Sequence, residues 1–195
     1  RKVDILNLKI EELNDEIVEQ EKKYKNVEKE TKEIVEDFNK LNELVENETN
    51  WTIPKVEMDL CSTNKTFKSF MDYRMITNKQ SKQYKLIQKL QKSSDGLLRD
   101  KDGYIAVALG SKYGNIGDRF IIKLSTNKEV RVIKADEKAD KDTVNGCYHK
   151  TDNSMIEVIV QKEFFEKSYK EASIMGDLNY SDLFNGSIIK IYKVI

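Results

Sequence analysis

The sequence predicts an α+β protein in which a long N-terminal coiled-coil helix precedes a small β-barrel. Three observations support this class. Apolar residues recur with heptad spacing through the first 48 residues, the only proline follows this stretch, and residues 103–195 alternate short apolar runs with turn-forming residues. With 195 residues, the chain has room for the helix and one domain of ordinary size.

The first element is a helix with an apolar seam at two of every seven positions. Its members are, at the first heptad position, Val3, Ile10, Ile17, Tyr24, Thr31, Phe38 and Val45, and, at the fourth, Leu6, Leu13, Gln20, Val27, Ile34 and Leu41. A single helix cannot bury such a seam on itself, so we expect a homo-oligomer formed through residues 3–45. β-Branched residues at the first position with leucine at the fourth favour a parallel dimer, while the two aromatic residues and the threonine at that position leave a trimer open. The alternative, a helical hairpin within one chain, lacks a break in the pattern before Asn47.

The helix is expected to end near Asn50. A polar run precedes Pro54 there, and proline cannot continue a helix. Glycine is absent before Gly96, as a long helix requires. Residues 1–50 are therefore assigned to a coiled-coil stalk.

Residues 51–102 are assigned to a linker that contains a short helix. This helix is predicted over residues 77–90, with Ser81 or Thr77 as its N-terminal cap. Residues 93–96 have the composition of a turn.

Residues 103–195 have the pattern of a β domain. Short apolar or alternating runs predict half-buried or buried strands, and one amphipathic run predicts a small helix. The strands are expected at residues 104–109, 119–124, 129–134, 155–160 and 187–194, and the helix at residues 164–172. Many short strands in so small a domain predict a barrel.

The overall charge is balanced, with 34 basic and 34 acidic residues. Binding to phosphate backbones needs a basic surplus, so nucleic acid is not an expected partner. No apolar run is long enough to span a membrane, and no signal peptide is visible. Because the sequence begins at Arg1 without a methionine, a leader or anchor before it stays open.

Two cysteines, Cys61 and Cys147, leave two alternatives open: one disulfide or two separate thiols. A disulfide would indicate an oxidising compartment. With His149 as the only histidine, the chain has too few ligands for a zinc site, and neither a metal nor a cofactor is expected.

Four segments follow one another in a distinctive order within the last domain. They are Gly117–Phe120, Val130–Asp136, Met155–Val158 and Phe164–Ala172. In order and spacing they are similar to the motifs of the barwin-like group, which includes expansins, rare lipoprotein A and the three-aspartate domains of bacterial wall enzymes. The resemblance implies a six-stranded double-psi β-barrel in a cell-wall protein. A separate region outside this domain, Phe67–Leu90, is similar to proteins of Gram-positive bacteria and their phages, which implies the context for such a protein.

The resemblance also implies a chemistry. Members of the group that cleave peptidoglycan are lytic transglycosylases, which need one carboxylic acid of raised pKa and no metal. Asp136 matches the catalytic acid of the group, and His149 and Glu157 are the expected partners that orient it or share its proton. The chain departs from the group at Glu157, where an aspartate is usual, and after Asp136, where Gly-Pro is replaced.

Substrate-binding residues are expected around this acid. Tyr104, Tyr113 and Tyr148 are candidates for a sugar-stacking surface, although aromatic residues in small barrels are more often core, and Asp152 is a candidate polar contact. The loop carboxylates lack the glycine and closing glutamate of an EF-hand, so calcium binding is not expected. Ordinary solvated carboxylates remain the alternative for Asp136.

Two functions follow as expectations. The first is a cell-wall-associated module that cleaves peptidoglycan glycan strands as a lytic transglycosylase-like enzyme. The second is a non-catalytic, stalked structural module that binds glycan or protein. Either function implies an extracellular or cell-surface location, or a place in a phage particle.

Overall fold

The computed structural model describes residues 2–48, 53–61 and 64–195, with only the backbone for residues 4, 5 and 41–48. The chain divides into two units, Arg1–Thr52 and Ile53–Ile195, and each is described by itself. Within the described ranges, no helix is both long and apolar enough to cross a membrane.

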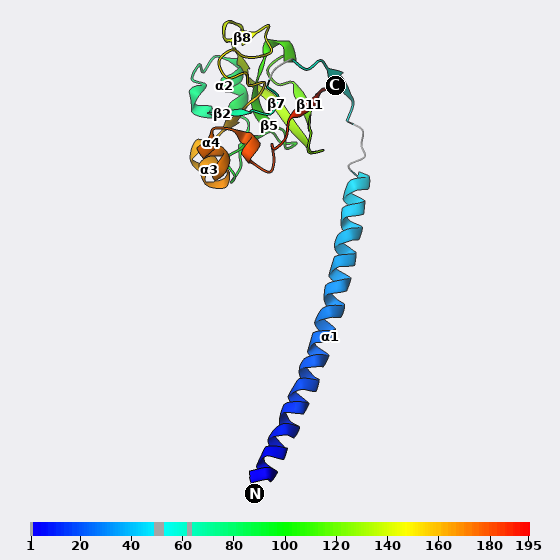
Figure 1. The fold of residues 1–195 in the computed structure, drawn as a ribbon. Helices are drawn as coiled ribbons and strands as arrows, with labels where there is room; N and C mark the ends of the chain where they lie inside the picture. Colours follow the sequence, from blue (N-terminus) through cyan, green and yellow to red (C-terminus); the bar gives the residue numbers. More distant parts are fainter. Residues whose placement is uncertain (1, 49–52, 62–63) are drawn as a thin grey trace. The chain divides into compact units, whose positions relative to one another are not determined.

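The described part of the first unit is one uninterrupted helix, α1 (Lys2–Glu48), which confirms the helix that the heptad spacing predicts (Figure 1). Pairs of opposite charge four residues apart, such as Lys23 with Glu19 at 2.9 Å, stabilise its surface. The predicted end near Asn50 lies outside the described residues.

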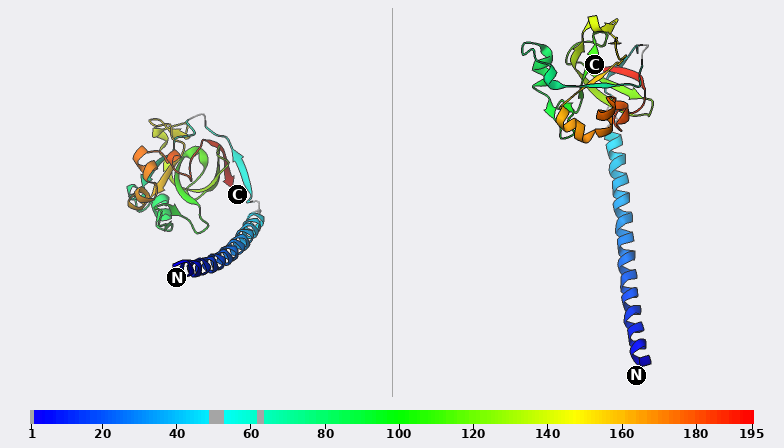
Figure 2. Two further views of the ribbon diagram at one scale, coloured as in Figure 1. Left: turned by 60° about the horizontal axis from the view of Figure 1, so that its bottom comes forward. Right: turned by 60° about the vertical axis from the view of Figure 1, so that its left-hand side comes forward.

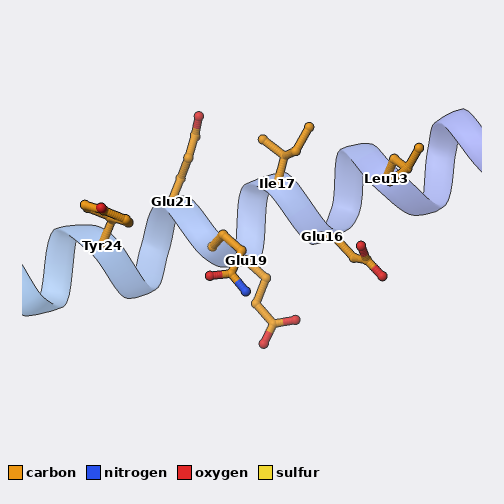
Figure 3. A pocket seen from close by; sticks show the side chains of 7 residues that line it. Leu13, Glu16, Ile17, Glu19, Glu21 and Tyr24 are labelled. Carbon is orange, nitrogen blue, oxygen red and sulfur yellow. The ribbon is translucent and has the colours of Figure 1, made fainter.

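The apolar seam of α1 is exposed along the single chain. Leu13 and Ile17 are each 54% exposed, and Figure 3 shows them and Tyr24 projecting from the helix. The other described seam residues with large exposed apolar side chains are Val3, Leu6, Ile10, Val27, Ile34 and Phe38. Oligomerisation through this seam stays a prediction.

The second unit is built on a nine-stranded mixed sheet. Its strands are β1 (Lys55–Met58), β2 (Ser69–Asp72), β3 (Gln91–Lys92), β4 (Leu98–Arg99), β5 (Ile105–Gly110), β6 (Arg119–Leu124), β7 (Glu129–Lys138), β10 (Glu157–Val160) and β11 (Ile188–Val194). The path of pairing is β1-β11-β6-β7-β5-β10-β2, and β4 joins β3 to β5. β5 pairs with β7 and β2 with β10 in parallel, and the other pairs are antiparallel.

The α+β class is confirmed, but the closed six-stranded barrel is not. Among the residues that the structure describes, the path of pairing has two free ends, β1 and β2. Both strands precede residue 103, and they extend the sheet beyond the predicted domain by pairing with β11 and β10.

Residues 55–99, which the sequence pattern places in the linker, supply four strands and a helix to this unit. The helix, α2 (Lys82–Ile87), is shorter than predicted. Its predicted cap is confirmed at Ser81, whose hydroxyl accepts a hydrogen bond from the backbone N–H of Tyr84 at 3.1 Å.

The sheet separates two clusters of buried side chains. The main core contains Val107 and Leu109 of β5 together with Phe120 of β6. A smaller core lies under α2, where Ile87 packs with Ala106 of β5. Helices α3 (Lys162–Ser168) and α4 (Lys170–Met175) replace the single predicted helix and lie next to one another (Figure 2).

A disulfide joins Cys61 to Cys147, which resolves the two alternatives left by the sequence. It ties the segment after β1 to the start of β9 (Tyr148–His149), which pairs with β8 (Thr143–Val144). The buried hydroxyl of Tyr113 donates to the sulfur of Cys61 at 2.8 Å and accepts from its backbone N–H at 3.3 Å.

Candidate functional site

Asp136 and Glu157 flank one small residue, Ala108, on neighbouring strands. Ala108 of β5 is the register partner of Asp136 on β7 and of Glu157 on β10. Directly opposed residues of a sheet point to the same face. The two carboxylates therefore share a face, with their Cα atoms about 10 Å apart, or two strand spacings.

A β-bulge in β7 produces this arrangement. Lys134 is paired with Val107 and Asp136 with Ala108, so Ala135 is an extra residue with no register partner on β5. An extra residue inverts the alternation of side chains beyond it. Without it, the side chain of Asp136 would point to the opposite face from Glu157.

Lys138 ends β7, two residues beyond Asp136 on the same strand. Strand alternation places it on the face of Asp136, where its side chain is only 5% exposed. Its Nζ lies 3.9 Å from Oε2 of Glu157 and donates a hydrogen bond to Oγ of Ser154 at 3.0 Å. Burial lowers the pKa of Lys138, against the opposing effect of the nearby carboxylates.

Burial raises the pKa of both carboxyl groups above the ordinary value. Burial raises the pKa of Asp136, and the negative charge of Glu137 adds to this, although the backbone N–H of Glu137 donates to Asp136 at 2.8 Å. Burial also raises the pKa of Glu157, against the opposing effect of Lys138. Because the Glu157 side chain is still 28% exposed, this pair remains accessible to a molecule from solvent.

His149 ends β9, and Asp152 lies in the turn that leads from β9 toward β10. Nδ1 of His149 accepts the backbone N–H of Thr151 at 3.3 Å, which leaves Nε2 as the protonated nitrogen of the neutral ring. Oδ1 of Asp152 lies 3.6 Å from Nδ1 and accepts the backbone N–H of Ser154 at 2.8 Å. Although burial opposes it, bonding from Ser154 lowers the pKa of Asp152, so this carboxylate stays charged beside the site.

The aromatic candidates are placed differently from one another. Tyr104 and Tyr113 are buried, and the guanidinium of Arg119 lies 4.7 Å from the ring centroid of Tyr104. Their exposed fractions are 4% and 0%, so neither ring lies at the surface as a platform for a sugar. Tyr148 is half-buried and lines a cavity of about 290 Å³ beside the disulfide, where Cys147 also contributes.

Lys138 and Ser154 are the members of this cluster that sequence reasoning missed. The alternation of residues 129–134 predicts a strand that ends at residue 134, whereas β7 continues through Lys138. The sequence does contain a signal for Lys138: it lies two residues after Asp136, and a strand that continued through both would place their side chains on one face. Nothing local marks Ser154, which is fully buried.

No metal site accompanies the cluster: within the described ranges, no group of three or more His, Cys, Asp or Glu side chains is arranged to hold an ion. Comparisons with protein-family models, curated proteins and solved structures found no match for this chain. The geometry of the cluster, together with the sequence motifs, is therefore the basis for assigning a function.

Proposed function

We propose that the second unit cleaves the glycan strands of bacterial cell wall as a lytic transglycosylase-like enzyme, with Asp136 as the acid. One observation carries the proposal: two half-buried carboxyl groups of raised pKa, Asp136 and Glu157, share one face of the sheet around Lys138. A raised pKa keeps a carboxyl group protonated near the working pH, which a general acid requires. The order of motifs shared with the barwin-like group supports the same reaction.

The reaction needs one acid that acts twice. The protonated carboxyl of Asp136 donates its proton to the glycosidic oxygen as the bond from this oxygen to the anomeric carbon breaks. The carboxylate then takes the proton of the C6 hydroxyl of the same sugar, whose oxygen attacks the anomeric carbon and closes a 1,6-anhydro ring. Asp136 ends protonated, and neither water nor a metal ion is consumed.

The other members of the cluster are Lys138, which affects the ionisation of the two carboxyl groups, and polar side chains around them. Lys138 stabilises the charged form of Glu157 and of Asp136, so the pKa of each carboxyl is raised less than burial alone would raise it. Glu157, on the other side of Ala108, is in position to orient a sugar hydroxyl. His149 and Asp152 bound the turn at the edge of the cluster.

The disulfide and the helix support a setting for this activity. A disulfide between Cys61 and Cys147 is typical of proteins exposed to an oxidising environment, which favours an extracellular or cell-surface location. The exposed seam of α1 favours a homo-oligomer of the chain, with a parallel dimer as the first expectation. Such a stalk would carry several copies of the second unit to the wall.

The position of Lys138 favours a second candidate function. This candidate is a non-catalytic module that binds wall glycan or protein on a cell surface or phage particle. Lys138 places a cation 3.9 Å from Glu157, which offsets the charge that would otherwise act on the substrate. Such an arrangement also suits hydrogen bonding to sugar hydroxyls without turnover.

Incubation with purified peptidoglycan distinguishes the two candidates. We expect anhydro-muropeptides, detected by mass spectrometry, from the wild type and from Asp142→Asn, an exposed control in the adjacent loop. For Asp136→Asn we expect a loss of at least about 100-fold, the usual contribution of a general acid. Equal product from Asp136→Asn would contradict the role of this residue, and wall binding without product from any variant would favour the binding module.

A further inference from the structure

A second cavity, of about 430 Å³, opens between α2 and the short 3₁₀ helix η1 (Tyr73–Met75). Its walls include two aromatic rings, Tyr73 and Tyr84, and two lysines, Lys79 and Lys92. None of the residues that line it is acidic. In a chain with equal numbers of acidic and basic residues, this local excess of positive charge selects for an anionic ligand.

The two lysines carry that charge. The third cation of the wall, Arg74, is already neutralised, because its guanidinium donates to both carboxylate oxygens of Asp72 and to Glu163 at 3.2 Å. Nζ of Lys92 lies 4.4 Å from the centroid of the Tyr73 ring and donates to its hydroxyl at 3.1 Å. Within the described part of the chain, no carboxylate forms an ion pair with Lys79 or Lys92.

The size and lining of the cavity suit one sugar residue or a short peptide. Small-ligand pockets usually measure about 300 to 1,000 Å³ and combine apolar walls with a few polar groups. Tyr73 and Tyr84 provide ring faces, and Gln88 provides both a donor and an acceptor. The cavity thus combines the features that bind a molecule with both apolar faces and carboxylates.

The cavity lies on the face of the sheet that carries the carboxylate pair. Ile159 of β10, two residues beyond Glu157, packs with Ile87 of α2 in the smaller core, and Tyr73 packs against the same cluster. Strand alternation places Ile159 and Glu157 on one face. One face therefore bears the carboxylates at one end and the cavity at the other.

Strand register gives their spacing. Ser69 of β2 is the partner of Glu157, and Tyr73 follows four residues later, directly after the strand ends at Asp72. At about 3.3 Å per residue, the cavity begins about 13 Å from Glu157 along the strand direction. An extended polymer that is held in the cavity would reach the carboxylates.

We propose that this cavity binds a carboxylate-bearing peptide substituent of the same wall glycan whose strand lies at Asp136. The inference rests on the proposed glycan substrate, but not on its cleavage. Lys79 and Lys92 pair with the peptide carboxylates, and Tyr84 packs against the chain beside them. The cavity thereby selects strands that still carry acidic peptides over strands without them.

Binding of full-length protein to soluble glycan strands tests the inference. The strands are used with their peptides and after enzymatic removal of the peptides, and each variant carries Asp136→Asn so that no strand is consumed. The test variants are Lys79→Gln with Lys92→Gln, and separately Tyr84→Ala. The matched control is Lys82→Gln with Lys85→Gln, which removes the same charge from exposed positions of α2 that do not line the cavity.

We expect the Lys79/Lys92 variant to bind peptide-bearing strands at least 10-fold more weakly in low salt, with the difference shrinking at high salt. Tyr84→Ala should weaken binding at both salt concentrations, and the control should match its parent. Peptide-free strands should bind all variants alike. Thermal melts of each variant verify that a loss of binding is not a loss of folding.

Equal binding of peptide-bearing strands by the Lys79/Lys92 variant and its control would overturn the inference, while anhydro products that depend on Asp136 would still uphold cleavage. A second outcome is that the Lys79/Lys92 variant binds peptide-bearing strands more weakly than its control, while the wild type forms no anhydro products. This outcome would support peptide binding in the cavity and contradict cleavage. If the Asp136→Asn parent bound neither kind of strand, both the peptide-binding cavity and the proposed glycan substrate would be overturned.

Discussion

The chemistry of the candidate site depends at the residue scale on one extra position in β7. Ala135 has no register partner on β5, and its presence turns Asp136 toward Glu157. The face that receives both side chains also receives Lys138, which has little contact with solvent. Three ionisable groups are thus held together where burial penalises each charge, and this is why all three pKa values shift toward the neutral form.

The first prediction concerns the stability contributed by Asp136. Because its pKa in the folded protein lies above the ordinary value of 3.8, the folded state retains this proton where the unfolded chain loses it. Folding stability therefore falls as pH rises from 3.8 through the raised pKa, and the charged form disfavours folding at pH 7. We expect Asp136→Asn to melt at a higher temperature than the wild type at pH 7, by calorimetry, and the gap to close below pH 3.8.

The exposed control Asp142→Asn should change the unfolding free energy by less than about 0.5 kcal/mol at either pH. A melting temperature of Asp136→Asn equal to or below that of the wild type at pH 7 would show that the Asp136 charge is well solvated.

The second prediction concerns the cation beside Glu157. Replacement of Lys138 by methionine removes the positive charge that opposes the effect of burial on this carboxyl. We expect the pKa of Glu157 to rise further in Lys138→Met, as measured by NMR titration of the side-chain carboxyl carbon. Lys141→Met, at an exposed position of the neighbouring loop, should leave that pKa unchanged. If both variants gave the wild-type value, the charge coupling between Lys138 and Glu157 would be disproved.

At the scale of elements, α1 and the sheet are stabilised by different means. The sheet buries apolar side chains on both faces of β5 within its own unit, whereas α1 leaves its seam exposed. Exposed apolar stripes of this length are typical of surfaces that pair with another chain. We therefore expect the long helix to depend on association with another chain, and the sheet to be stable within its own unit.

The third prediction tests this dependence. Ile17→Lys places a charge in the middle of the seam, while Val18→Lys adds the same charge at an exposed position beside it. We expect Ile17→Lys to shift the chain to monomer in light scattering and to lower helicity in circular dichroism at micromolar concentration. Val18→Lys should keep the wild-type mass. A wild-type chain that is monomeric at all concentrations would refute the coiled coil.

At the scale of the whole molecule, contacts between segments far apart in the chain stabilise the second unit. β1 and β2, from early in this unit, pair with β11 and β10, and the disulfide links positions 86 residues apart. A cross-link across so long a loop restricts the unfolded chain strongly.

The fourth prediction is the effect of removing this cross-link. We expect Cys61→Ser with Cys147→Ser to lower the unfolding free energy of the protein by about 2 to 5 kcal/mol, as measured by urea denaturation. Reductant should lower the stability of the wild type to a similar degree and leave the double variant unaffected. If reductant changed neither protein, the disulfide would be absent from the wild type in solution.

Local pattern was enough to predict much of this fold. Heptad spacing predicts a helix over residues 1–50, which is confirmed over Lys2–Glu48, and apolar runs predict β6 and β11 nearly to the residue. The α+β class follows from the same patterns. Periodicity succeeds here because it reports which side of an element is apolar, a property of neighbouring residues alone.

The pairing of distant segments was decided only by the tertiary structure. The sequence marked Asp136 and Glu157 separately, but their common face depends on a bulge and on the order of three strands. Lys138 entered the site because β7 continues where local pattern predicts its end. Strand register, bulges and cross-links are set by contacts between residues far apart in the chain, so local periodicity does not encode them.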